Sequence, residues 1–73
     1  MRETIFDEHA MRLLLASKGL TIEAWAKALN ISKVTLYRKM SGESDFWRDE
    51  IQKTCEFVEE KSLNYIFFAS RVT

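Results

Sequence analysis

The chain has 73 residues, of which 47% are hydrophobic and 30% charged, and its 11 basic and 11 acidic side chains give a formal net charge of zero. This length predicts one small domain over residues 1–73, and no apolar run approaches the 18 or more residues of a membrane-spanning helix. Zero net charge also removes the general attraction to phosphate on which most DNA-binding proteins rely.

The first part of the chain predicts a helix. Proline is absent and the only glycines are Gly19 and Gly42, which favours an all-α chain with few sharp turns. Thr4 can cap free backbone amides, so the first helix is predicted to begin there and to end at Gly19. Its buried face is expected to consist of apolar residues spaced i, i+4, i+7 and i+8, namely Phe6, Ala10, Leu13 and Leu14.

The middle of the chain predicts two short helices joined by a brief turn, which is the signature of a helix-turn-helix. Thr21 caps the first of them, and Asn30 stands at the turn because Asn tolerates positive φ well. Ser32 caps the next helix, which Gly42 ends. The apolar residues expected to face inward are Ile22, Trp25, Ala26 and Leu29, followed by Leu36 and Met40.

Two further helices are predicted, and no segment shows the alternation of a strand. The fourth helix has two possible starts. Either Trp47 is the cap residue and Glu50 the third helical residue, or Asp45 is the cap and Trp47 lies in the first turn. Ser62 is expected to cap a short last helix. The inward faces of these two helices are expected to be Ile51, Cys55 and Val58, then Leu63, Ile66 and Phe67.

Charge is distributed unevenly along the chain. Residues 21–42 carry a net charge of +3, and the basic side chains of Lys33, Arg38 and Lys39 fall within one short segment. Residues 43–60 carry −5 from seven acids and two bases. A phosphate backbone would attract the first segment and repel the second.

Catalysis and metal binding have little support in the sequence. His9 is the single histidine and Cys55 the single cysteine, so neither a metal-ligand cluster nor a nucleophile with a neighbouring base is recognisable. We expect no enzyme activity, no metal, no cofactor and no small-molecule substrate. Cys55 is expected in the core, because it falls on an apolar helical face. Charged residues at positions 2, 3, 7 and 8 argue against a signal peptide, and the protein is expected in the cytoplasm.

A resemblance is carried by LTIEAWAKALNISKVTLYRKMSGESDF, residues 20–46, which resembles the helix-turn-helix of small Cro and repressor proteins. EIQKTCEFVEEKSLNYIFF, residues 50–68, is similar to the tail of phage-encoded versions from Gram-positive hosts. Over about residues 5–69 the resemblance implies a compact all-α bundle of about five helices, lambda-repressor-like, whose third helix enters the DNA major groove. The positions that this implies for DNA contact are Ser32, Lys33, Val34, Thr35, Tyr37 and Arg38.

Three residues depart from the family pattern. Ile22 stands where a phosphate-binding Gln is common, and Glu43 stands where Lys or Arg is usual. Trp47 replaces a Ser or Thr, and the sequence leaves open whether its indole is buried in the core or exposed at an interface. Each departure removes a phosphate contact, repels phosphate or adds apolar surface.

Two functions therefore remain open. The first is a modulator of repression, or antirepressor, in the lysis–lysogeny switch of a temperate phage, which binds the N-terminal helix-turn-helix domain of the phage repressor. The alternative is a Cro-like transcriptional repressor that binds operator DNA, alone or with the repressor. The acidic segment favours the first function, because it can cover a basic DNA-reading face. The residues predicted to bind the partner are Val34, Tyr37, Arg38, Glu43, Asp45 and Trp47.

Overall fold

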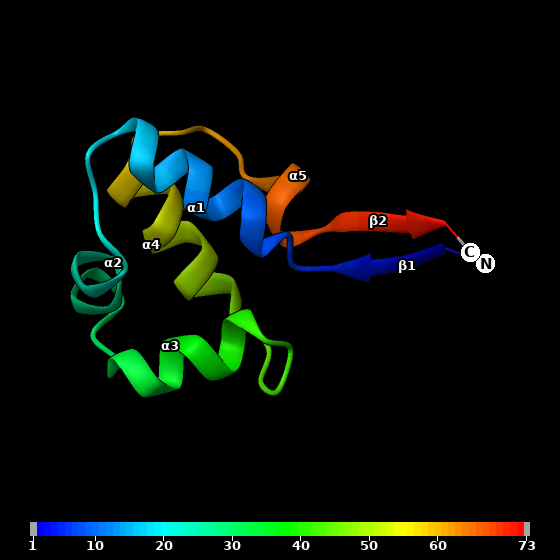
Figure 1. Ribbon diagram of the computed structural model, residues 1–73, viewed down its shortest axis with the longest axis horizontal. Coiled ribbons are helices and arrows are strands. Elements are labelled where there is room, and N and C mark those ends of the chain that lie inside the picture. Colours follow the sequence, from blue (N-terminus) through cyan, green and yellow to red (C-terminus); the bar gives the residue numbers. More distant parts are fainter. Residues whose placement is uncertain (1, 73) are drawn as a thin grey trace.

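The computed structural model describes the backbone of residues 2–72 and the side chains of residues 6–68. Its body consists of five helices: α1 (Glu8–Ser17), α2 (Ile22–Leu29), α3 (Lys33–Met40), α4 (Arg48–Val58) and α5 (Asn64–Phe67). The body confirms the predicted all-α bundle of about five helices. An antiparallel ribbon of two strands, β1 (Arg2–Ile5) and β2 (Ala69–Val72), projects from it (Figure 1). No strand was expected, so the ribbon is an addition to the predicted fold.

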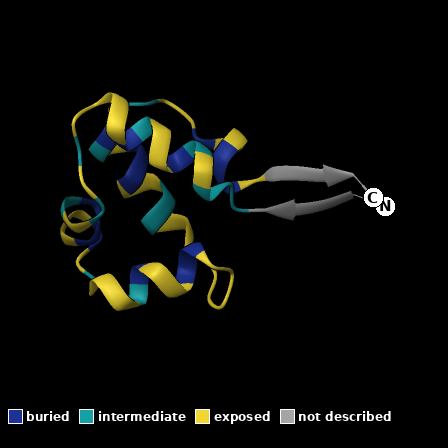
Figure 2. Cartoon of the chain, viewed as in Figure 1, coloured by how far each residue is buried: buried dark blue, intermediate teal, exposed yellow. Residues whose placement is uncertain are grey.

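The core lies where the inner faces of the five helices meet, and the outer faces carry the exposed residues (Figure 2). Trp25 is fully buried and contacts an aromatic cluster in which ring centroids lie 4.9–6.3 Å apart. Rings in such clusters stabilise the core by more than their buried area alone. The cluster joins α2 and α5 to the segments that precede α1 and α4, and its members are Phe6, Trp25, Phe46 and Phe67.

The start of α1 differs from the prediction. Thr4 lies in β1 opposite Ser70, and Asp7 caps the helix, because its Oδ1 accepts a hydrogen bond of 3.0 Å from the amide of Ala10. The amide of Asp7 also donates to the carbonyl of Ile66 at 2.7 Å, which ties this end of α1 to α5. The cap bond of Asp7 is local, but Thr4 is held outside the helix by the pairing of β1 with β2, which local helix propensity does not reveal.

The inner face of α1 also differs from the prediction. The predicted spacing of apolar residues was counted from Phe6, but Phe6 lies before the helix. Met11 and Leu15 are fully buried, whereas Leu13 is 58% exposed. Ala10 and Leu14 are half-buried against the core, as expected.

The last part of the chain agrees better with the prediction. The expected inner residues of α5 are buried, and Cys55 lies in the core. Leu63 rather than Ser62 occupies the cap position of α5, because the Ser62 hydroxyl reaches only the amide of Asn64, at 3.4 Å. His9 is exposed on α1. Among the described residues, no helix is both long and apolar enough to cross a membrane.

The residue after α4 predicts a stabilising substitution. Glu59 has φ 59° and ψ 41°, a left-handed conformation that costs a residue with a Cβ about 1–2 kcal/mol. We expect Glu59→Gly to raise the free energy of unfolding by about 0.5–1 kcal/mol, since part of this gain is offset by the greater chain entropy of glycine. Denaturation in urea measures the change.

Glu56→Gly is the matched control for this substitution, because Glu56 is an exposed acid inside the same helix. It should lower the free energy of unfolding by about 1 kcal/mol, the usual cost of glycine in a helix interior. A loss of stability in Glu59→Gly would contradict the prediction.

Candidate binding surface

The connection between α2 and α3 has the geometry predicted from the sequence. Asn30 adopts the left-handed conformation at φ 59°, and its amide donates to the carbonyl of Lys27 at 3.0 Å. The hydroxyl of Ser32 caps α3 by accepting from the amide of Thr35 at 3.1 Å. This short turn carries α3 along one edge of the body, with its outer side away from the core (Figure 1).

The outer side of α3 brings together most of the predicted site residues. Leu36 and Met40 are buried beneath it. Val34 is 62% and Tyr37 is 42% exposed, and both are neighbours on a helical surface because they lie three residues apart. Ser32 is exposed and Thr35 is half-buried, and their hydroxyls bond to each other at 2.9 Å. The remaining exposed residues of this side are Lys33 and Arg38.

Lys39 does not belong to the exposed basic segment, contrary to the reading of the sequence. Its side chain is only 7% exposed, and its Nζ lies 3.0 Å from the Oε1 of Glu50. The same Nζ donates a hydrogen bond of 2.9 Å to the carbonyl oxygen of Asp45. Lys39 is therefore held inside the molecule, where it cannot contact phosphate.

The connection between α3 and α4 folds back against the end of α3. The amides of Glu43 and Ser44 donate to the carbonyl of Arg38 at 2.9 and 3.2 Å. Gly42 has φ 89°, a conformation that permits this reversal without strain. Glu43 and Asp45 are both exposed, so two acids flank the last turn of the basic helix.

Trp47 is the cap residue of α4, which decides between the two predicted starts. Its backbone is extended, at φ −82° and ψ 156°, and its amide donates to the Oε1 of Glu50 at 2.8 Å. This is one half of a capping box; the indole has no oxygen with which to complete the other half. Trp47 is also 69% exposed. Its indole therefore lies at the surface and not in the core.

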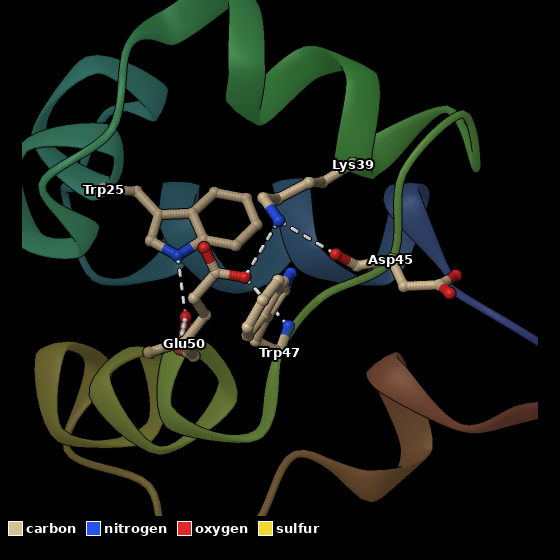
Figure 3. A network of polar contacts seen from close by, with 6 residues as sticks. Trp25, Lys39, Asp45, Trp47 and Glu50 are labelled. Atoms are coloured by element: carbon tan, nitrogen blue, oxygen red, sulfur yellow. Dashed lines mark hydrogen bonds and ion pairs between the residues drawn. The ribbon is translucent and has the colours of Figure 1, made fainter.

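A polar network joins α2, α3 and α4 beside Trp47 (Figure 3). The indole Nε1 of Trp25 donates to the hydroxyl of Thr54 at 2.9 Å, and that hydroxyl donates to the carbonyl of Glu50 at 2.8 Å. The side chain of Glu50 then accepts from Lys39 and from the amide of Trp47. In the described part of the chain, every buried side-chain nitrogen and oxygen has a partner.

The sequence reading missed Lys39, Glu50 and Thr54 as parts of one network. A signal was present for Lys39, because it follows Leu36 by three residues and precedes Met40, which puts it beside the inner face of the helix. No comparable signal pairs it with Glu50, since that contact depends on how α3 packs against α4.

Two hollows lie along α4 and do not include the predicted site residues. The first has a volume of about 320 Å³ and is lined by Phe46, Arg48, Ile51, Gln52 and Phe68. The second, about 580 Å³, is a shallow depression lined mainly by charged residues, Arg48, Asp49, Gln52, Lys53 and Glu56. Within the described residues, no group of three or more His, Cys, Asp or Glu side chains is placed to hold a metal ion.

The residues predicted to bind a partner thus lie on two neighbouring elements: Val34, Tyr37 and Arg38 on the outer side of α3, and Glu43, Asp45 and Trp47 on the connection to α4. The surface of these two elements offers apolar groups, two cations and two carboxylates to a macromolecule. Comparison of the chain with models of protein families, with curated proteins and with solved structures found no match.

Proposed function

We propose that this protein binds a phage repressor and modulates or blocks the repressor's binding to DNA, as an antirepressor of a lysis–lysogeny switch. The observation that carries the proposal is the 69% exposure of Trp47 beside the acids Glu43 and Asp45. An indole is a large apolar group that gains free energy when another surface covers it. Tryptophan is also enriched among the residues that contribute most to protein–protein binding.

The charges near Trp47 suit a basic partner. A repressor must neutralise phosphates to bind its operator, so its DNA-reading face is rich in Lys and Arg. Glu43 and Asp45 present exposed carboxylates on the connection between α3 and α4. Complementary charges of this kind speed association and favour the correct partner. The proposed partner surface is therefore the helix-turn-helix domain of the repressor.

Val34, Tyr37 and Arg38 would extend the contact along α3. Val34 and Tyr37 are exposed apolar or aromatic groups, and Arg38 is exposed beside them. Aromatic residues and Arg are enriched at the centres of protein interfaces, whereas Lys and acids are found mainly at the rims. This composition supports a protein partner for the face.

Several contacts that would hold DNA are weakened in this chain. Lys39 is engaged by Glu50, and Glu43 would repel phosphate next to α3. Ile22, at the start of α2, has no side-chain donor for phosphate. Because the net charge is zero, the rest of the molecule adds no general attraction to phosphate to that of the remaining cations.

A second candidate function is a Cro-like repressor that uses α3 to read operator DNA, alone or with the phage repressor. It is favoured by the exposure of Lys33 and Arg38 along the outer side of α3. Arg38 could make a paired contact with guanine, and Val34 could touch a thymine methyl group. Either function would be carried out in the cytoplasm of a bacterial host.

A mobility-shift experiment separates the two functions. We expect the isolated protein to bind operator DNA only in the non-specific range, with Kd of about 10⁻⁴–10⁻⁶ M at physiological salt, because its charges balance. The operator should come from the same switch as the test repressor, which we expect to be encoded by a divergent neighbouring gene. Adding the protein should then change the shift that this repressor produces.

The outcomes of this experiment are distinct. Nanomolar, salt-sensitive binding of the isolated protein to the operator would reject the antirepressor proposal and support the Cro-like function. An unchanged repressor shift, together with no direct association in calorimetry, would reject the proposed partner.

A further inference from the structure

Lys39 and Glu50 form an ion pair that differs from the others in the described part of the chain. Their side chains are 7% and 13% exposed, whereas those of Arg12–Glu8 and Lys18–Glu60 are 31–47% exposed. Taking two charges out of water is costly, and a buried pair often stabilises a fold no better than apolar residues of similar size. Stability alone is therefore a poor explanation for this pair.

The remaining side-chain hydrogen bonds of the pair both reach the connection between α3 and α4. Lys39 donates to the carbonyl of Asp45 at 2.9 Å, and Glu50 accepts from the amide of Trp47 at 2.8 Å. We call this set of four residues the clasp: Lys39, Asp45, Trp47 and Glu50 (Figure 3). The bonds of the clasp hold the backbone of the connection at Asp45 and at Trp47, on both sides of Phe46.

Phe46 determines which way Trp47 faces. Its ring packs inward, 4.9 Å from the rings of both Phe6 and Phe67. Since Trp47 follows in extended backbone, its side chain points to the opposite side from that of Phe46. The aromatic contact sets the direction of the indole, and the clasp sets the position of the backbone that carries it.

We infer that Lys39 and Glu50 are positioning residues that fix Asp45 and Trp47 relative to α3, and so determine which partner the surface accepts. This inference rests on the proposed function for the identity of the partner. Its structural part does not depend on that identity. An ordered connection presents its groups without the entropy loss that a mobile segment suffers on binding.

The test replaces the clasp with apolar side chains, using Lys39→Met together with Glu50→Leu. The double variant removes both charges at once, so it leaves no unpaired ion and should keep its thermal midpoint within about 5 °C of the parent. Backbone order parameters of residues 45–47 should fall below about 0.6, whereas those of α2 should stay near 0.85. Affinity for the repressor domain should fall at least tenfold.

Glu8→Leu with Arg12→Met is the matched control, because it removes an exposed ion pair from α1 without changing the net charge. It should change neither the order parameters of residues 45–47 nor the affinity. Glu50→Asp is the second variant if the apolar pair does not fold. It keeps the charge, shortens the carboxylate's reach by one methylene, and should shift both measurements in the same direction.

Unchanged order parameters in residues 45–47 would overturn the inference, and so would a mobile connection that still binds the repressor with parental affinity. If the parent protein itself does not bind the repressor, the proposed function fails. The order parameters then decide the positioning role on their own, so the two failures can be told apart.

Discussion

Trp47→Ala is expected to weaken binding to the repressor domain by about 2–4 kcal/mol, or roughly 30- to 1000-fold in Kd. Trp47 is 69% exposed and its indole Nε1 donates no hydrogen bond to another described residue, while the backbone amide of residue 47 keeps its bond to Glu50. The substitution should therefore change stability by no more than about 0.5 kcal/mol. Isothermal titration measures the affinity, and thermal unfolding measures the stability.

Tyr65→Ala provides the control for this loss of binding. Tyr65 is a 58% exposed aromatic residue on α5, outside the proposed surface. Its removal should leave the affinity within twofold of the parent. Equal losses in the two variants would show that general surface hydrophobicity, rather than the position of Trp47, governs binding.

Glu50→Ala is expected to lower the free energy of unfolding by about 3–5 kcal/mol, because it leaves the ammonium group of Lys39 buried without a counter-charge. A domain of this size has only about 5–10 kcal/mol of stability, so the variant should unfold at a much lower urea concentration or be partly unfolded. It also deprives the amide of Trp47 of its acceptor.

Glu8→Ala is the comparison for the buried pair. It breaks the exposed contact with Arg12, which should be worth less than about 1 kcal/mol because both groups remain in water. If Glu50→Ala costs no more than Glu8→Ala, the Lys39 ammonium finds water in the folded state, and the ion pair is not the anchor of the connection.

Much of the unit formed by α2, the turn at Asn30 and α3 could be predicted from the sequence, because its determinants are local. The hydroxyls of Thr21 and Ser32 cap α2 and α3 within three residues of their own positions. Asn30 takes the left-handed turn that its type tolerates, and its conformation needs only its immediate neighbours. The inner residues Leu36 and Met40 also follow from helical spacing alone.

The errors concern contacts between distant parts of the chain. Thr4 lies in β1 rather than in α1, because β1 pairs with β2 at the opposite end of the sequence. Short four-residue strands with no clear alternation give almost no signal before that partner is known. Leu13 is exposed because the inner face of α1 runs through Met11 and Leu15, whereas the predicted spacing was counted from Phe6, which lies before the helix.

In the candidate surface, too, some features follow from the local sequence and others from long-range contacts. The sequence by itself determined which residues α3 presents outward, since a helix fixes the directions of its own side chains. Only the tertiary structure decided whether the side chains of Lys39 and Trp47 are buried or exposed. Both α3 and α4 pack against α2, which places Glu50 next to Lys39 and keeps that cation out of solvent, and the inward ring of Phe46 turns the neighbouring indole toward solvent. Helical spacing alone places Lys39 beside the inner face of α3, but its pairing with Glu50 and the contacts of the Phe46 ring are long-range, and no local pattern records them.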